Sequence, residues 1–347
     1  MNRKINYIKV KDLFGVPNND FELHFFDDLN ILTGRNGSGK TSILKILWFA
    51  ISGHFDILTK EIDFSYLKVI TDLAEIEIKK EKKKLLNFSI NFYDTNYKKY
   101  NQDFKNYSLK PIIDKVHSSL FFPTFRRVEG GYSIIPKIGE NVEGNDLYKS
   151  MNSLSQGLSR ESQSYFNHIF VAYASTNDLD RRLKDEIAFV KTEKDKINED
   201  RIEKISQLSR ESKNTEIQEL IDQTNQELQK LESRFDDLHS LVNEYIKKPI
   251  LLSDKLIIGT QNTAPIPSQR LSAGEKQLFA FLCYLVFSEN KVIFIDEPEI
   301  SMHPDWQQDF IPLLMKIKAN NQFIIATHSD LIVAPYAHRE IELKSQL

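Results

Sequence analysis

The chain has 347 residues, of which 41% are hydrophobic, and a formal net charge of −3 at pH 7. This length gives one large domain or two small ones with a real core, and the near-neutral charge excludes a whole-chain attraction to nucleic acid. A single cysteine excludes a disulfide framework, no apolar run reaches the ~18 residues of a membrane span, and the first residues lack a signal-peptide pattern. We therefore expect a cytoplasmic protein with no membrane contact and a buried thiol at Cys283.

Strand patterns come first along the chain and lead into a phosphate-binding loop. Residues 3–33 alternate apolar and polar side chains and end in the apolar run Leu29–Leu32, which predicts two or three short strands, the last one buried. The next segment, Gly34–Thr41, fits the pattern G-x-x-x-x-G-K-T, whose backbone N–H groups close around phosphate oxygens. Apolar residues then recur on a helical period, so a helix should run from Thr41 to about Gly53.

The phosphate-binding loop supplies the first site residues. Lys40 should reach the β- and γ-phosphates of a nucleotide, and Thr41 should offer its hydroxyl to Mg²⁺. The nucleotide-binding residues predicted from this segment are Gly34, Arg35, Asn36, Gly37, Ser38, Gly39, Lys40, Thr41 and Ser42.

Two further strand patterns carry basic residues that leave two interpretations open. Residues 73–79 and 85–93 alternate as the strands of a β-hairpin with a basic tip, Lys79–Lys84. Such a tip is ordinarily a solvated turn, and its functional interpretation is a contact with DNA phosphates. A strand beginning at Ser119 leads into a loop with paired arginines, Arg126 and Arg127, and loop-like sequence continues to about residue 157.

A helical arm is expected in the middle of the chain, where residues 158–248 contain neither Gly nor Pro. Charged residues dominate residues 178–248, and two helical runs fit, at about 178–209 and 215–246. The second run keeps apolar residues at spacings of three and four over four heptads, which is typical of a coiled coil. We predict an antiparallel hairpin of about 50 Å.

A second anion site is predicted after the arm. Residues 271–277 read Leu-Ser-Ala-Gly-Glu-Lys-Gln and open a helix that should run from about Glu275 to Phe287. A serine hydroxyl, a glycine N–H and a helix N-terminus together attract an anion. The candidate residues for this site are Ser272, Gly274 and Glu275.

Acidic and histidine residues follow two buried strands near the end of the chain. The apolar run Val292–Ile295 ends in Asp296 and Glu297, at the edge of a parallel sheet where ligands bind. Asp296 suits the Mg²⁺ shell together with Thr41, and Glu297 suits a residue that orients the attacking water. His328 follows the apolar run 323–327 and is predicted to contact the γ-phosphate. The predicted catalytic residues are Lys40, Glu297 and His328, and the predicted metal ligands are Thr41 and Asp296.

These motifs, in this order, resemble the ABC-type ATPases, and within them the SMC, Rad50, RecF and OLD branch. The resemblance implies an α/β P-loop nucleotide-binding domain, with a mixed sheet flanked by helices, that is interrupted by an inserted antiparallel helical hairpin or coiled coil. Residues 1–177 and 249–347 would form the two parts of the ATPase lobe, and residues 178–248 would form the insert.

The resemblance also implies how the motifs work together. Two copies, arranged head to tail, would sandwich two ATP molecules, with Ser272 and Gly274 of each copy serving the nucleotide of the other. Residues 301–306 would be the D-loop, which crosses that interface. The usual Q-loop glutamine is missing from residues 122–127, so Arg126 and Arg127 are candidates for a different role there.

Short ATPases of this kind resemble the ATPase subunits of Septu, retron and PARIS-type anti-phage systems. The chain ends 19 residues after His328 with neither a TOPRIM domain nor an HNH-like cluster, so we expect any nuclease effector, of HNH or TOPRIM type, to be a separate polypeptide. The expected function is an ATP- and Mg²⁺-dependent ATPase subunit that forms a homodimer or higher oligomer and controls that nuclease. One alternative is a repair or recombination ATPase that clamps DNA directly. The other is a nucleotide-gated scaffold with negligible turnover.

Overall fold

The chain forms two compact units, residues 1–173 with 288–347 and residues 174–287. The phosphate-binding loop belongs to the first unit, whereas the hairpin and the signature segment, residues 271–277, belong together to the second. The computed structural model describes residues 4–81, 84–93, 99–101, 118–124, 168–171, 176–210, 214–246, 250–252, 256–258, 271–300, 302–317 and 319–344.

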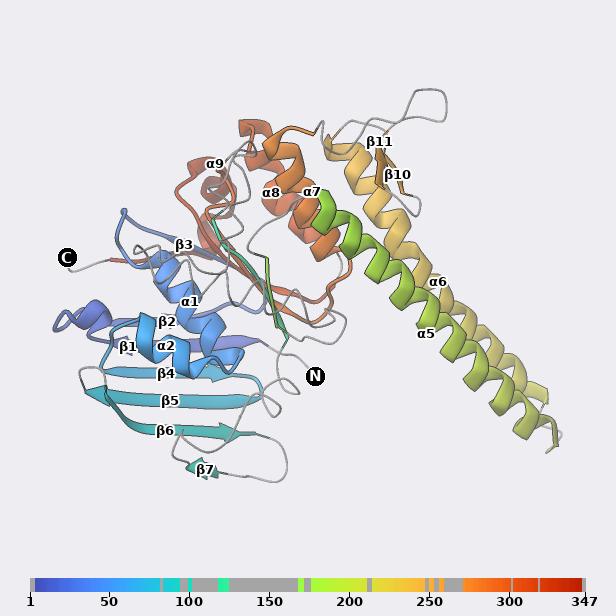
Figure 1. Ribbon diagram of the computed structural model, residues 1–347, viewed down its shortest axis with the longest axis horizontal. Coiled ribbons are helices and arrows are strands. Elements are labelled where there is room, and N and C mark those ends of the chain that lie inside the picture. The colour runs from blue at the N-terminus through green and yellow to red at the C-terminus, as the bar shows by residue number, and fades with distance from the viewer. Residues whose placement is uncertain are drawn as a thin grey trace, which may run out of the picture. The chain divides into compact units, whose positions relative to one another are not determined.

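The first unit contains an antiparallel sheet of six strands in the order β2-β1-β4-β5-β6-β7 (Figure 1). Side chains alternate along its strands, as in β4, where Leu67, Val69 and Thr71 are buried and their neighbours are partly exposed. One face of the sheet therefore packs on a core while the other faces outward. Its strands are β1 (Ile5–Lys11), β2 (Phe21–His24), β4 (Tyr66–Thr71), β5 (Ala74–Glu81), β6 (Lys84–Phe92) and β7 (Lys99–Asn101).

A second sheet of the same unit is parallel throughout, in the order β14-β3-β13-β12-β8-β9. All residues of β12 and β13 are buried, as expected for parallel strands covered on both faces. The carboxyl ends of such strands meet at one edge, and this edge carries the candidate site. The strands are β3 (Leu29–Thr33), β8 (Ser119–Phe122), β9 (His168–Phe170), β12 (Val292–Asp296), β13 (Gln322–Ala326) and β14 (Glu340–Glu342).

Helix α1 (Lys40–Ile51) packs between the two sheets and begins at the phosphate-binding loop (Figure 1). Its apolar residues Ile43 and Leu47 belong to one core with residues of β1, β4 and β5 on one side and of β12 and β13 on the other. The ring centroid of Trp48 lies 5.9 Å from that of Phe121 in β8. Burial on both sides fixes the helix, and therefore its N-terminal end, relative to the parallel sheet.

The predicted β5–β6 hairpin is confirmed, but one lysine of its basic tip has a structural role. The Nζ of Lys80 donates to the carbonyl oxygens of Thr59 at 3.0 Å and Ile62 at 2.7 Å, at the end of α2 (Phe55–Glu61). The Lys80 side chain is only 1% exposed, so it is not available to a DNA phosphate. The neighbouring Lys79 is exposed and pairs with Glu77.

The second unit is built on the predicted antiparallel pair, α5 (Thr176–Arg210) and α6 (Asn214–Ile246). Lys194 pairs with Glu232, and Arg201 donates to Asn225 at 3.3 Å, so polar contacts join the two helices along the exposed part of the pair. No helix among the described residues is long and apolar enough to cross a membrane.

The base of the hairpin packs on α7 (Ala273–Leu285), the helix that the signature segment opens. The guanidinium carbon of Arg182 lies 5.3 Å from the ring centroid of Tyr284, and the rings of Phe235 and Phe287 are 5.0 Å apart. Cys283 is fully buried within α7, as predicted. A small two-stranded sheet, β10 (Ile250–Leu252) and β11 (Leu256–Ile258), completes the unit.

Some predictions concern residues outside the described part of the chain. These are the paired arginines Arg126 and Arg127, the loop to about residue 157, Lys82 and Lys83 of the basic tip and Ser301 of the D-loop segment.

Candidate nucleotide-binding site

The phosphate-binding loop joins β3 to α1 and depends on its glycines. Gly34 has a φ of +139°, and a Cβ there would lie 2.7 Å from both the carbonyl oxygen of Leu343 and the Oγ of Ser38. Gly39 has a φ of +96° and lies against Leu13, which a Cβ would approach to 3.3 Å. Only glycine adopts these conformations without strain, so the loop is held close to its neighbours on both sides.

Lys40 is the first residue of α1, and its side chain folds over the loop. Its Nζ donates to the carbonyl oxygens of Gly34 at 2.9 Å and Arg35 at 3.2 Å. Burial lowers the pKa of Lys40, and the nearby carboxylates of Glu297, Asp296 and Glu299 partly offset that shift. A largely buried lysine side chain beside a curved backbone loop suits a phosphate group of a nucleotide.

Asp296 ends β12 and accepts hydrogen bonds from two hydroxyl groups. Thr41 lies 3.0 Å and 3.1 Å from its two carboxylate oxygens, and the Oγ1 of Thr124 donates to Oδ2 at 2.8 Å. Burial raises the pKa of Asp296, while the hydrogen bonds from Thr124 and Thr41 act in the opposite direction. The fold thus brings together Thr41 and Asp296, which are 255 residues apart in the sequence.

Glu297 follows Asp296 and has a backbone conformation that residues other than glycine rarely adopt. Its φ is +48°, and its N–H donates to the carbonyl oxygen of Ala326 at 2.8 Å. Non-glycine residues in the left-handed region concentrate at functional sites, where the surrounding structure supports the strain. Here the strained turn directs the Glu297 side chain into the same cavity that Lys40 and Thr41 line.

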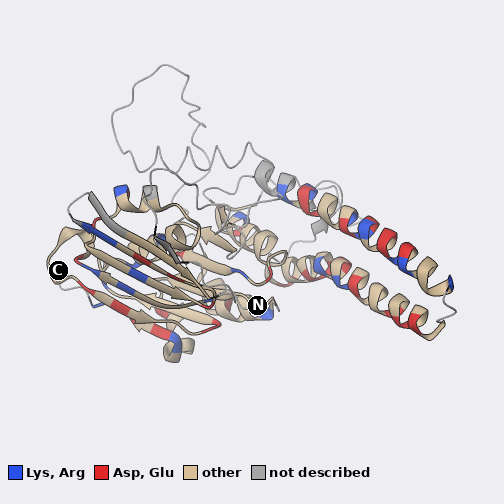
Figure 2. Cartoon of the chain, turned by 90° about the horizontal axis from the view of Figure 1, so that it is seen from below, with Lys and Arg blue, Asp and Glu red and all other residues tan. Residues whose placement is uncertain are grey.

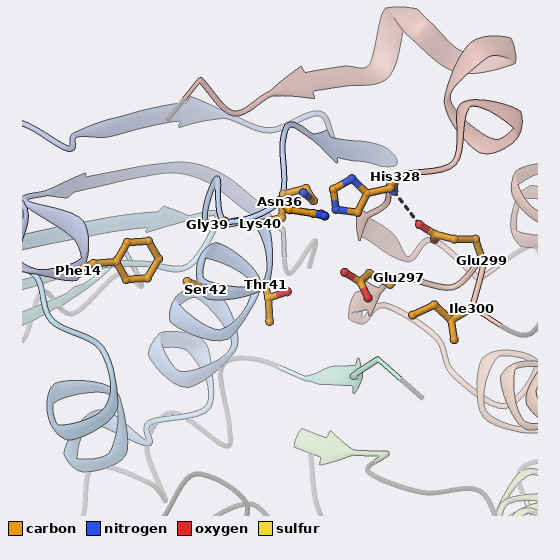
Figure 3. Close-up of a pocket in the computed structure, with 11 residues that line it drawn as sticks. Phe14, Asn36, Gly39, Lys40, Thr41, Ser42, Glu297, Glu299, Ile300 and His328 are labelled. Carbon is orange, nitrogen blue, oxygen red and sulfur yellow. Dashed lines mark hydrogen bonds between the residues drawn. The ribbon is translucent and has the colours of Figure 1, made fainter. Parts of the chain in front are cut away.

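The loop after β13 carries His328 and is bonded to Glu299. The carboxylate of Glu299 accepts the N–H of His328 at 2.7 Å and the hydroxyl of Thr327 at 2.8 Å. In Figure 3 the imidazole of His328 lies beside Asn36 and Lys40, while the dashed line joins its main chain to Glu299.

These elements surround a cavity of about 720 Å³, a volume suited to a small-molecule ligand (Figure 3). One side of it is formed by a short 3₁₀ turn, Leu13–Gly15, in which Phe14 has a φ of +66° and is 41% exposed. Its exposed ring, held at the edge of the cavity, presents a face for stacking. The cavity is lined by Phe14, Asn36, Gly37, Gly39, Lys40, Thr41, Ser42, Glu297, Glu299, Ile300 and His328.

The predicted residues of the first unit thus divide into three groups. Most of the phosphate-binding loop, with Glu297 and His328, lines the cavity. Gly34, Ser38 and Asp296 lie behind this surface and support it. Arg35 is exposed and is not among the lining residues.

The signature residues form a helix start of the predicted kind in the second unit. The Oγ of Ser272 accepts the N–H of Glu275 at 3.3 Å, and the carboxylate of Glu275 accepts the N–H of Ser272 at 2.8 Å. This reciprocal pair is a capping box at the N-terminus of α7. Glu275 therefore stabilises its own helix, and Ser272 is exposed at its end.

Three residues of the site were not predicted from the sequence. Thr124 follows β8, and because β8 pairs in parallel with β12, with Phe122 opposite Ile295, its end lies beside Asp296. The sequence signal that could have indicated Thr124 is its place just after the buried apolar strand β8, where polar residues often bind ligands. Glu299 and Phe14 carried no comparable signal, because their positions depend on contacts with distant segments.

The residues around Asp296 fit a magnesium ion bound together with a nucleotide. Within the described part of the chain, no group of three or more His, Cys, Asp or Glu side chains forms a complete metal site. Mg²⁺ normally takes one or two protein oxygens and completes its shell with phosphates and water. The buried carboxylate of Asp296 and the hydroxyl of Thr41 beside it provide two such oxygen ligands.

Comparison with known proteins identifies relatives of the chain. It is 26% identical to the "Retron Vc95 probable ATPase" of Vibrio cholerae serotype O1 biovar El Tor, over 91% of this chain and 69% of that protein. It is 34% identical to the "Retron Ec83 probable ATPase" of Escherichia coli, over 21% of this chain and 16% of that protein.

Among solved structures, the chain is similar to an Smc head bound to the C-terminal winged-helix domain of ScpA. The TM-score is 0.46 at 12% identity, over 95% of this chain and 91% of that one. An SMC head domain from Thermotoga maritima gives a TM-score of 0.40 at 14% identity, over 95% and 91%.

A family model also matches most of the chain, from residue 29 to residue 334. The matched range includes the phosphate-binding loop, the inserted hairpin, the signature segment, the acidic strand end and His328. The chain therefore belongs to the family described as AAA domain, putative AbiEii toxin, Type IV TA system, and it is a nucleotide-binding ATPase.

Proposed function

We propose that the chain is the ATPase subunit of a bacterial anti-phage defence system, in which ATP-dependent assembly of two or more copies controls a separate nuclease. Two relatives are named as a "Retron Vc95 probable ATPase" and a "Retron Ec83 probable ATPase", and the family description includes "putative AbiEii toxin, Type IV TA system". Both descriptions favour a role in bacterial conflict rather than in membrane transport.

The observation that carries the ATPase part of the proposal is the convergence of hydroxyl and carboxylate groups at the edge of the parallel sheet. Thr41 and Asp296 are within hydrogen-bond distance, while Lys40 and Glu297 line the adjoining cavity. Phosphoryl transfer to water depends on position and charge neutralisation rather than on covalent catalysis by the protein. These four side chains provide both.

Each residue then has a specific role. Lys40 binds the β- and γ-phosphates, and Thr41 and Asp296 hold Mg²⁺, which neutralises phosphate charge when bound. Glu297 accepts a hydrogen bond from the attacking water and orients it, and His328 binds the γ-phosphate. The exposed ring of Phe14 stacks on the adenine.

The dimeric part of the proposal rests on the start of α7. Ser272 is exposed at the N-terminus of a helix, and such an end attracts phosphate. In the proposed dimer, Ser272 and Gly274 of one copy bind the ATP held by the other copy, so nucleotide joins the two copies and hydrolysis loosens them.

Direct clamping of DNA is the second candidate, and the described residues favour it less. Lys80 is buried against α2, Lys79 is paired with Glu77, and α6 carries eight acidic and two basic residues. Acidic side chains recur along both helices of the hairpin (Figure 2). Because α5 carries nine acidic and nine basic residues, the acidic excess of the hairpin comes from α6. This excess repels phosphate, so the hairpin suits a protein partner better than DNA.

The experiment that tests the proposal uses the chain together with its genomic neighbours. Lys40→Ala should weaken ATP binding at least tenfold, since a charge-assisted contact contributes about 1.5–3 kcal/mol, and it should abolish protection in a phage plaque assay. Native mass spectrometry of the wild-type complex should find a nuclease encoded by a neighbour.

Two results would separate the parts of the proposal. Normal ATP affinity in Lys40→Ala contradicts the nucleotide site itself. An ATP-dependent dimer without a protein partner, whose affinity for DNA rises with ATP and falls with salt, instead favours direct DNA clamping.

A further inference from the structure

Glu299 lies in the nucleotide cavity but has no role in the reaction described above. It follows the strained Glu297 by two residues and is partly buried. Its carboxylate contacts the loop that carries His328 rather than the phosphate-binding loop. Its place in the lining of the cavity nevertheless suggests a function in the reaction.

Both oxygens of the Glu299 carboxylate are engaged by neighbouring donors of one loop. One oxygen accepts the main-chain N–H of His328 at 2.7 Å, and the other accepts the hydroxyl of Thr327 at 2.8 Å. These are short, charge-assisted hydrogen bonds, which are stronger than neutral ones. The partner Thr327 is fully buried, so its hydroxyl has a fixed position.

The hydroxyl of Thr327 extends this contact along the loop. Besides donating to Glu299, its Oγ1 accepts the N–H of Ser329 at 3.0 Å. The hydroxyl of Ser329 donates to Gln307 at 2.6 Å, and the amide of Gln307 donates to the carbonyl of Met302 at 3.1 Å. The main chain is therefore bonded on both sides of His328, whose own side chain is exposed to the cavity.

We propose that Glu299 is a positioning residue for hydrolysis: by binding the main chain of His328 and the hydroxyl of Thr327, it fixes the imidazole of His328 where the γ-phosphate lies. Glu299 touches neither nucleotide nor water in this scheme and acts through His328. The proposal rests on the γ-phosphate role of His328 given under Proposed function.

Glu299→Gln is the informative substitution because it keeps the size of the side chain. The amide oxygen still accepts the N–H of His328. The amide nitrogen, however, is a donor facing Thr327 Oγ1, which already accepts the N–H of Ser329. The hydroxyl can then only accept from this amide through its second lone pair, so the charge-assisted hydrogen bond that Thr327 donates to Glu299 is lost and the imidazole is less firmly placed.

The test is a double-mutant cycle in the full-length chain, with steady-state ATP hydrolysis as the first measurement. We expect Glu299→Gln to lower kcat about tenfold, since about 1.4 kcal/mol is a factor of ten, while KM for ATP changes less than about threefold. In the His328→Ala background the same substitution should lower kcat by less than about twofold, because residues that act as a unit are non-additive. Glu342→Gln, an exposed carboxylate paired with Lys344, is the matched control and should behave as wild type.

A nucleotide-binding measurement tests the positioning role of Glu299 independently of turnover. The ratio of the Kd for ADP to the Kd for a non-hydrolysable ATP analogue reports recognition of the γ-phosphate. It should fall in Glu299→Gln and in His328→Ala, and it should fall no further in the double variant.

Each outcome bears on a different statement. Equal losses from Glu299→Gln in both backgrounds overturn the proposal, because Glu299 then acts independently of His328. Wild-type kcat and an unchanged binding ratio in His328→Ala remove the γ-phosphate role of His328, and the positioning role of Glu299 with it. A loss of thermal stability in Glu299→Gln with an unchanged binding ratio leaves only a structural role and also overturns the proposal.

Discussion

At the scale of single residues, the contacts of Asp296 show how far motif spacing predicts a site. Its pairing with Thr41 follows from the two motifs alone, because each has a fixed place at the end of a strand or the start of a helix. Thr124 lies in the segment, residues 122–127, from which the usual Q-loop glutamine is missing, and its hydroxyl donates to the same carboxylate. The polar residue after an apolar strand was a sequence signal for Thr124, but its contact with Asp296 depends on the register of β8 against β12, which local sequence does not contain.

Thr124→Val tests this contact. Valine has nearly the same shape but no hydroxyl, so Asp296 loses one hydrogen bond and is held less firmly. The Mg²⁺ concentration for half-maximal hydrolysis should rise about fivefold, in line with ~1 kcal/mol for one hydrogen bond.

A matched substitution shows whether this effect is specific. Thr192→Val removes a hydroxyl that bonds within α5 and should leave the Mg²⁺ dependence as in the wild type. An equal shift in both variants, or none in Thr124→Val, would remove Thr124 from the site.

At the scale of elements, long and regular sequence patterns predicted helices and strands well, whereas the shortest strands were not predicted. The strands around the phosphate-binding loop, the β5–β6 hairpin and both arm helices lie within a few residues of their predicted positions. By contrast, β9 and β14 have three residues each and exist through pairing with distant strands, as β14 does with β3. Local sequence contains little of that information.

Lys79 and Lys80, at the end of β5 in the β5–β6 hairpin, give a prediction at this scale. Lys80→Met should lower the free energy of unfolding by about 1–3 kcal/mol, because it leaves the carbonyls of Thr59 and Ile62 without a buried donor. Lys79→Met, on the neighbouring exposed side chain, should change it by less than about 0.5 kcal/mol. Chemical denaturation measures both.

DNA binding by the same two variants separates the interpretations of the basic tip. The structural role predicts that Lys80→Met leaves any DNA affinity unchanged once the protein is folded. A large loss of DNA affinity in Lys80→Met, with normal stability, would instead make this lysine a phosphate contact.

At the scale of the whole molecule, the two halves of the proposed ATP-binding machinery lie in different units of the chain. The phosphate-binding loop, Glu297 and His328 belong to the first unit, and Ser272 begins α7 in the second, packed against the base of the hairpin. The proposed sandwich brings these parts together across two copies of the chain. A dimer held by nucleotide gives a nuclease partner a state to recognise.

Native mass spectrometry of Glu297→Gln, with and without ATP, is the direct test of the proposed nucleotide-held dimer. Removing the residue that orients water should slow hydrolysis at least a hundredfold, within the range for a lost general base, so bound ATP persists. Ser272→Arg in the same background places a bulky side chain at the proposed contact. Ser272→Ala removes the helix cap, at about 1 kcal/mol, and the hydroxyl proposed to bind ATP, but it keeps the main-chain N–H groups of the helix end and adds no bulk.

We expect an ATP-dependent dimer containing two ATP molecules for Glu297→Gln, a dimer that forms only at higher ATP concentration for its combination with Ser272→Ala, and an ATP-bound monomer for its combination with Ser272→Arg. A Glu297→Gln protein that binds ATP and stays monomeric, or a dimer that Ser272→Arg does not disturb, would contradict the proposed dimer.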